Sequence, residues 1–107
     1  MEHVVVFITA PSMEEGKKIA RKVVEEKLAA CANIVPALHS IYWWQGKIET
    51  ADEVMLIVKT KSSMVTRLVD RVKKLHSYTV PEIVALPIMD GNRDYLKWID
   101  DSLKILH

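Results

Sequence analysis

Residues 30–60 read ACANIVPALHSIYWWQGKIETADEVMLIVKT, two extended patterns that meet at Gln45-Gly46. The first pattern is interrupted at Pro36, and the second contains a continuous apolar stretch from Val54 to Val58. A residue pair ending in glycine between two such patterns is typical of the tight turn of a β-hairpin. The sequence therefore predicts two long antiparallel strands over residues 30–44 and 47–60.

The predicted hairpin is long for the size of the chain. Arms of about fourteen residues reach roughly 46 Å at about 3.3 Å per residue, whereas a domain of this length is only about 33 Å across. Unless Pro36 breaks the first arm early, the tip with Tyr42, Trp43 and Trp44 overhangs the body. Exposed aromatic strands aggregate unless another chain covers them, so we expect an oligomer.

The flanking segments predict the remaining elements. Residues 3–9 are short and rich in β-branched side chains, which indicates a buried strand. Ser12 and Glu15 have the spacing of a capping box, and the apolar residues behind them recur at helical intervals as far as Leu28. After the hairpin, residues 65–75 predict a helix, residues 83–88 a strand, and the residues beyond Asp90-Gly91-Asn92 a final helix.

This order of elements is β-α-β-β-α-β-α. The first six match a ferredoxin-like βαββαβ arrangement, an antiparallel sheet with both main helices on one face. The predicted class is therefore α+β, with an additional C-terminal helix and a long hairpin between the second and third strands. A chain of 107 residues and 12.2 kDa has room for one core, so we expect a single domain over residues 1–107.

Composition limits the classes of partner. Fifteen Lys and Arg against 14 Asp and Glu give a net charge of +1, which argues against a dedicated nucleic-acid binder. An RNA-recognition fold remains an alternative because residues 61–76 are basic, but the third strand lacks aromatic residues for base stacking. The single cysteine excludes an internal disulfide and favours a reducing compartment. With no visible targeting or membrane segment, we expect a cytoplasmic protein with no membrane or nucleic-acid partner.

His76 is the best candidate for a metal ligand. It ends a predicted helix, and Tyr78 and Glu82 follow closely; imidazole and carboxylate groups are common metal ligands. The alternative is a surface histidine that interacts with the negative end of its helix. An acidic cluster that includes Glu49 and Glu53 also has two interpretations: it is either a cation site or a solvated edge of the hairpin.

Six of the seven aromatic residues fall in three short segments: the hairpin tip, the loop near Tyr78, and the final helix. Neighbouring strand residues Trp43 and Trp44 point to opposite faces. This pattern indicates packing in a core or subunit interface, or a ligand pocket that includes Glu82. No nucleophile with a nearby base and no glycine-rich phosphate loop is found, so we expect neither an enzyme nor an organic cofactor.

Four blocks of the sequence are distinctive when taken together: LAACANIVP at 28–36, SIYWWQGKIE at 40–49, LHSYTVPEI at 75–83 and GNRDYLKWI at 91–99. They closely resemble the corresponding segments of the CutA-type divalent-cation tolerance proteins. The blocks occur in the family's order and spacing over nearly the whole chain. A match of four separate blocks is much more specific than one short motif.

The resemblance implies a cytoplasmic, non-enzymatic homotrimer similar in assembly to PII-type signalling proteins, with a role in tolerance of copper and other divalent cations. The hairpins would clasp neighbouring subunits, with Tyr42, Trp43, Trp44, Glu49 and Tyr78 at the subunit interface or cleft. The implied cofactor is a divalent cation such as Cu²⁺. The alternative function is a PII-like trimeric sensor of a small ligand, in which metal binding is incidental.

Copper positions proposed for some bacterial members are a cysteine in the first strand and a histidine pair near the second helix. This sequence has Ile8 in place of the cysteine and Leu75 in place of the first histidine, and Ser77 replaces the family's usual proline. Two of the three proposed ligands are therefore absent. His76 remains as the predicted metal ligand, with Glu82 as a second candidate.

Overall fold

The computed structural model describes residues 2–105. Its helices and strands follow the predicted order: β1 (His3–Ala10), α1 (Met13–Glu25), β2 (Cys31–Trp44), β3 (Lys47–Lys61), the short 3₁₀ helix η1 (Ser62–Met64), α2 (Val65–Leu75), β4 (Ile83–Pro87) and α3 (Arg93–Ser102). The strands form one sheet in the order β2-β3-β1-β4, and all neighbours are antiparallel. The predicted α+β, ferredoxin-like class with an additional C-terminal helix is confirmed.

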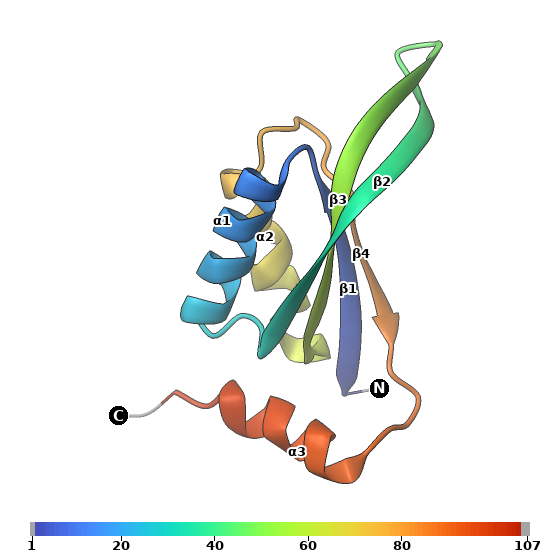
Figure 1. Cartoon of the computed structure of the whole chain (residues 1–107). Coiled ribbons are helices and arrows are strands. Elements are labelled where there is room, and N and C mark those ends of the chain that lie inside the picture. Colours follow the sequence, from blue (N-terminus) through green and yellow to red (C-terminus); the bar gives the residue numbers. More distant parts are fainter. Residues whose placement is uncertain (1, 106–107) are drawn as a thin grey trace.

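Helices α1 and α2 cover the same face of the sheet, and α3 lies across one end (Figure 1). Alternate strand residues are buried against the two covering helices, as the two-residue period of a strand requires; they are Val4, Val6 and Ile8 of β1 and Val54, Leu56 and Val58 of β3. Gly16 lets α1 approach β3 closely, because a Cβ atom at this position would lie 2.9 Å from Cγ2 of Val54. The core therefore lies between this face and the two helices.

The start of α1 matches only half of the predicted capping box. The Ser12 hydroxyl accepts a hydrogen bond from the backbone N–H of Glu15 at 3.1 Å. The Glu15 carboxylate, however, accepts from the backbone N–H of Ser77 at 3.0 Å. The predicted return bond, from the backbone N–H of Ser12 to the Glu15 carboxylate, is therefore wrong. The carboxylate bonds the loop after α2 instead.

The hairpin continues through its irregularity and projects from the body (Figure 1). The β2–β3 register shifts between Val35 and Leu38, next to Pro36, which lacks a backbone donor, and Ala37, whose φ is 69°. The strand then pairs as far as Trp44. Gln45 and Gly46 have φ values of 50° and 79°, as a tight hairpin turn requires. The longest dimension of the molecule is 46 Å, against 29 and 22 Å for the others.

Two kinds of contact hold α3 at its end of the sheet. Ile99 and Leu103 are buried with Ala30 in a small second core, and Nε2 of His3 lies 2.8 Å from Oδ1 of Asp100. No helix in the part of the chain that the structure describes has the length and apolar character needed to cross a bilayer.

Candidate functional site

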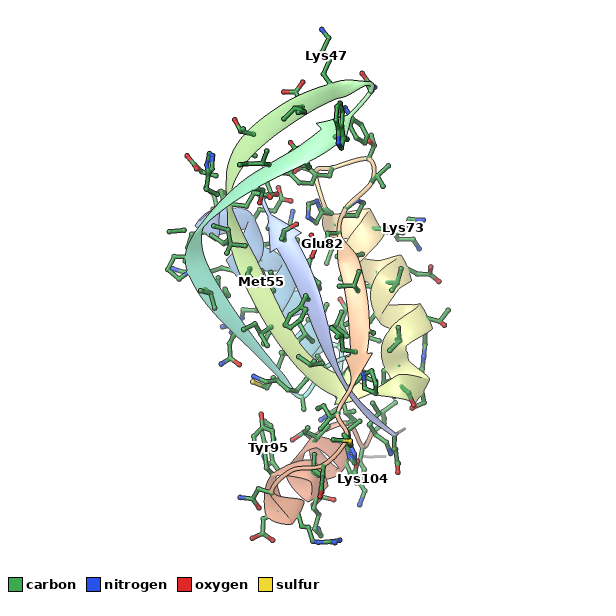
Figure 2. The ribbon with its side chains drawn as sticks, turned by 90° about the vertical axis from the view of Figure 1, so that its right-hand side faces the viewer. Lys47, Met55, Lys73, Glu82, Tyr95 and Lys104 are labelled. Atoms are coloured by element: carbon green, nitrogen blue, oxygen red, sulfur yellow. The ribbon has the colours of Figure 1, made fainter. Side chains whose placement is uncertain are left out.

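A cleft of about 730 Å³ lies between the upper part of the hairpin and the loop that leads into β4. The hairpin contributes residues 40–44, the loop contributes Tyr78, Thr79, Val80 and Glu82, and the sheet contributes Thr9 and Glu53. In Figure 2, Lys47 marks the hairpin tip and Glu82 lies near the end of the sheet from which the hairpin projects. The overhang of the hairpin and the path of the loop together create the cleft.

The cleft brings together most of the residues that the sequence singled out. Tyr42, Trp43, Trp44, Tyr78 and Glu82 all line it. Glu49 does not line the cleft, although it stands opposite Tyr42 in the β2–β3 register; it is exposed. The interface or cleft role predicted for Tyr42, Trp43, Trp44, Glu49 and Tyr78 stays a prediction. Four of these five line one cavity, together with Glu82, which was predicted as a metal ligand.

Glu53 and Tyr78 form a polar pair at the wall of the cleft. The Tyr78 hydroxyl donates to Oε2 of Glu53 at 2.8 Å, and Glu53 is only 7% exposed. Burial, followed by this hydrogen bond, raises the pKa of the Tyr78 hydroxyl far above its usual value. The phenol therefore stays protonated and remains a donor to the carboxylate. Of the two interpretations of the acidic cluster, a solvated edge does not describe Glu53.

His76 is buried, and both of its ring nitrogens have partners within the chain. Nε2 lies 2.7 Å from the carbonyl oxygen of Thr9, which only accepts, and Nδ1 accepts from the backbone N–H of Tyr78 at 3.0 Å. These partners assign a neutral ring with its proton on Nε2. Oε2 of Glu15 is 3.3 Å from Nδ1. The alternative of a surface histidine is wrong, because its side chain is enclosed by β1, α1 and the loop.

This arrangement does not fit a metal centre formed by one chain. A metal ion binds through a nitrogen lone pair, and the Nδ1 lone pair of His76 already accepts the hydrogen bond from Tyr78. Glu82 lines the cleft, whereas His76 does not. Among residues 2–105, no three His, Cys, Asp or Glu side chains converge as a metal site would require. The metal-ligand roles of His76 and Glu82 therefore stay predictions.

Sequence reasoning missed Thr9 and Glu15 and did not separate Glu53 from the exposed members of the acidic cluster. The carbonyl of Thr9 and the carboxylate of Glu15 act on residues 76–77 across more than sixty positions of sequence, and local spacing carries no signal for such contacts. Glu53 did have a signal: it directly precedes the apolar run 54–58. A carboxylate next to a buried apolar run is expected to be less exposed than Glu49 and Asp52, and Glu53 is.

Comparison with known proteins places the chain in a family. The family model described as CutA1 divalent ion tolerance protein matches residues 4–102. The chain belongs to the CutA1 family. It is 56% identical over 98 residues to the divalent-cation tolerance protein CutA of Thermus thermophilus, covering 92% of this chain and 95% of that one. It is 49% identical over 102 residues to the Archaeoglobus fulgidus protein of the same name, covering 95% of this chain and 99% of that one.

Solved CutA structures have the same fold. The Thermus thermophilus protein superposes with a TM-score of 0.89 at 57% identity, covering 91% of this chain and 94% of that one. The Archaeoglobus fulgidus protein, described as a periplasmic divalent cation tolerance protein, gives 0.92 at 48% identity, with 95% and 99% covered. The resemblance noted in the four sequence blocks is confirmed.

The predicted cytoplasmic location is overturned. The rice and Arabidopsis CutA relatives are named chloroplastic, and the Archaeoglobus structure is described as periplasmic. This chain spans only 57% and 56% of the length of the two plant relatives. Family members therefore occupy different compartments, and a single cysteine and a short apolar first strand do not distinguish among them.

Proposed function

We propose that this CutA1-family chain is a non-enzymatic homotrimer that takes part in divalent-cation tolerance and binds a metal ion or small ligand in clefts at its subunit boundaries. The observation that carries the assembly is the projecting hairpin. Trp43 at its tip is 72% exposed, and Ile41 and Ile48 are exposed nearby. Apolar side chains on a projecting strand pair are stabilised by cover from another chain.

The uncovered face of the sheet supports the same proposal. Val84 and Leu86 of β4 stand opposite Phe7 and Val5 of β1, on the face that α1 and α2 leave open. Both β4 residues are exposed, as is Val35 of β2. A second apolar surface, separate from the hairpin tip, suits a subunit that contacts more than one neighbour. The number of three subunits is what the resemblance to the CutA-type family implies.

The assembly is tested by light scattering on a sizing column. A trimer has three times the chain mass of 12.2 kDa. A uniform monomer at micromolar concentration would contradict the proposal.

One observation favours the PII-like sensor as a second candidate. Both ring nitrogens of His76 are engaged, so a small ligand in the cleft requires less rearrangement than a metal ion on this ring. Titration calorimetry with Cu²⁺ separates the two candidates. Heat that is present in the parent and lost in His76→Ala supports metal binding at His76, whereas equally negligible heats favour the sensor.

His39 provides the control for this titration. It is the exposed histidine on the hairpin, with Nδ1 2.9 Å from Oδ1 of Asp52. His39→Ala should leave any Cu²⁺ heat at His76 unchanged. Loss of the heat in His39→Ala alone would assign the ion to the hairpin and contradict the role of His76.

A further inference from the structure

We infer that the outer surface where α1 and α2 lie side by side, the helix seam, is a docking surface for an extended acidic segment of a partner protein. Its cations are Lys18, Lys22 and Lys74, the seam lysines. The inference goes beyond the proposed function, because it concerns neither the cleft nor the subunit contacts. It is supported by the distribution of charge, the position of the seam lysines, their lack of partners and their spacing.

Positive charge is concentrated in the helical layer of this nearly neutral chain. Residues 12–28 and 62–76, which contain α1 and α2, carry nine Lys and Arg against five Asp and Glu. The remaining residues carry six against nine, so the two parts have formal charges of +4 and −3. An acidic partner is therefore attracted to the helical side of the molecule.

Two contacts identify the flank of α1 that borders α2. In the first turn of α1, Glu15 accepts a hydrogen bond from the loop that follows α2. Just after the last turn, Glu26 accepts from Nε and Nη2 of Arg71 on α2, at 2.9 Å each. Lys18 and Lys22 stand between these carboxylates at steps of three and four residues, and side chains at those spacings share one flank of a helix. Both lysines therefore lie along the seam.

Lys74 lies on the flank of α2 that borders α1. It is three residues beyond Arg71, which bonds Glu26 across the seam, and so shares the flank of Arg71. The Arg71 hydrogen bond lowers the pKa of Glu26, and the nearby charge of Lys22 adds to this effect. Because Arg71 offsets Glu26, Glu15 is the carboxylate on the seam that opposes the three lysines.

The seam lysines have no ionic partner within residues 2–105. All three are exposed, and none forms an ion pair, whereas other basic residues of the chain do. Glu14 and Asp70 stand one turn from Lys18 and Lys74 and make no ion pair with them. The three ammonium groups are therefore available to carboxylates of another molecule.

Spacing and composition favour an extended acidic peptide as the partner. Lys18 and Lys22 are separated by a rise of about 6 Å along α1, and alternate side chains of an extended peptide are about 6.6 Å apart on one face. Residues 12–28 and 62–76 contain no Phe, Tyr or Trp on which nucleic-acid bases could stack. The apolar faces of both helices are buried against the sheet, so neither is left to enter a bilayer.

The seam stays open in the proposed assembly. Helices α1 and α2 cover one face of the sheet (Figure 1), whereas the proposed subunit contacts use the hairpin tip and the opposite face, which carries Val84 and Leu86. An acidic partner can therefore reach the seam lysines whether the chain is a monomer or a trimer.

The test uses a fluorescent octapeptide of alternating glutamate and serine, and anisotropy with the full chain at pH 7 and low salt. The same peptide with glutamine in place of glutamate is the uncharged control. We expect saturable binding of the acidic peptide alone, with an affinity that falls as salt rises. The double variant Lys22→Gln, Lys74→Gln should bind about threefold more weakly or worse, because it loses two exposed ion pairs. Full binding by this variant, or equal binding of the glutamine peptide, would overturn the inference.

The double variant Lys17→Gln, Lys73→Gln is the matched control, because it removes the same charge from the same two helices. Each residue precedes a seam lysine and so lies about 100° around its helix from it, and Lys73 projects outward from α2 in Figure 2. Its affinity for the acidic peptide should equal that of the parent. Equal weakening of both double variants would reveal diffuse attraction to the helical layer and overturn the docking surface.

Two further probes test the class of partner. A single-stranded oligonucleotide of the same charge as the acidic peptide, and vesicles that contain an anionic lipid, are titrated under the same conditions. We expect both to bind more weakly than the acidic peptide. Tighter binding of either one would overturn the assignment to an acidic protein segment.

Discussion

At the scale of single residues, the His76 side chain links segments that are distant in the sequence. Its ring connects the carbonyl of Thr9 at the end of β1 with the backbone N–H of Tyr78 in the loop. Tyr78 in turn bonds Glu53 on β3. These bonds fix the loop that forms one side of the cleft, so His76 positions the cleft without lining it.

Replacement of His76 by alanine should lower the free energy of unfolding by about 2–4 kcal/mol, because it leaves a cavity and removes the His76 partner of one buried and one partly buried backbone group. Urea unfolding at a fixed protein concentration measures the change. His39→Ala, at an exposed position, should stay within about 0.5 kcal/mol of the parent. Equal stability of the two variants would show that the ring of His76 has no structural role.

Tyr78 should make the folded state sensitive to alkaline pH. Burial and the Glu53 carboxylate raise its pKa in the folded chain, whereas an unfolded tyrosine ionises near about pH 10. Above that pH the unfolded state binds fewer protons than the folded state, so the free energy of unfolding falls as pH rises. Below pH 10 this contribution is constant.

Tyr78→Phe should therefore reduce the loss of stability between pH 10 and 11, by at most about 1.4 kcal/mol per pH unit for one group. Urea unfolding at pH 8, 10 and 11 measures the slope. Part of the slope should persist in this variant, since burial and Cys31 also raise the pKa of Tyr95. Parallel pH profiles for parent and variant would contradict the assignment.

At the scale of elements, the contact of α1 with the sheet depends on Gly16. A Cβ atom here would lie 2.9 Å from Cγ2 of Val54 and 3.3 Å from Cδ1 of Leu56. Valine is stiff about its first side-chain torsion, so the Cγ2 atom of Val54 cannot easily rotate away from an added Cβ atom. The better helix propensity of alanine, about 1 kcal/mol, acts in the opposite direction.

We expect the clash to prevail, so that Gly16→Ala destabilises the protein by about 1–3 kcal/mol. The matched control is Gly91→Ala, because a Cβ at Gly91 has no neighbour closer than 3.9 Å; its effect should stay within about 0.5 kcal/mol. Thermal unfolding of both variants gives the comparison. A Gly16→Ala protein more stable than the parent would show that the helix shifts without cost.

At the scale of the whole molecule, the hairpin tip should matter for assembly and little for the subunit. Trp43 is largely exposed within one chain, so Trp43→Ser removes few internal contacts. A buried aromatic residue at an interface commonly contributes about 2 kcal/mol or more. Trp43→Ser should therefore dissociate at higher protein concentration than the parent.

Light scattering over a dilution series measures this dissociation. Val24→Ser is the control, because Val24 is a partly exposed residue of α1 on the helical side of the sheet. Its assembly should match that of the parent. If Trp43→Ser and the parent dissociate at the same concentration, the hairpin tip does not hold the subunits together.

Local patterns in the sequence determined the elements, their order and the fold class. Periodicity of apolar residues, the turn at Gln45-Gly46 and the start of the last helix at Asn92 all depend on neighbours a few positions apart, and all match the structure. The overhang of the hairpin followed from residue counts and strand rise. The aromatic and acidic residues of the cleft were identified by type, and the family by four blocks of sequence.

The tertiary structure alone decided what those residues do to one another. It buried Glu53 beside Tyr78 and gave both ring nitrogens of His76 a partner. It also placed the Glu15 carboxylate at the backbone N–H of Ser77, where it does not cap its own helix. These contacts join residues between 2 and 67 positions apart, most of them from different elements. Whether a side chain is a ligand, a cap or a structural tie depends on which groups reach it in space, and spacing along the chain does not contain that information.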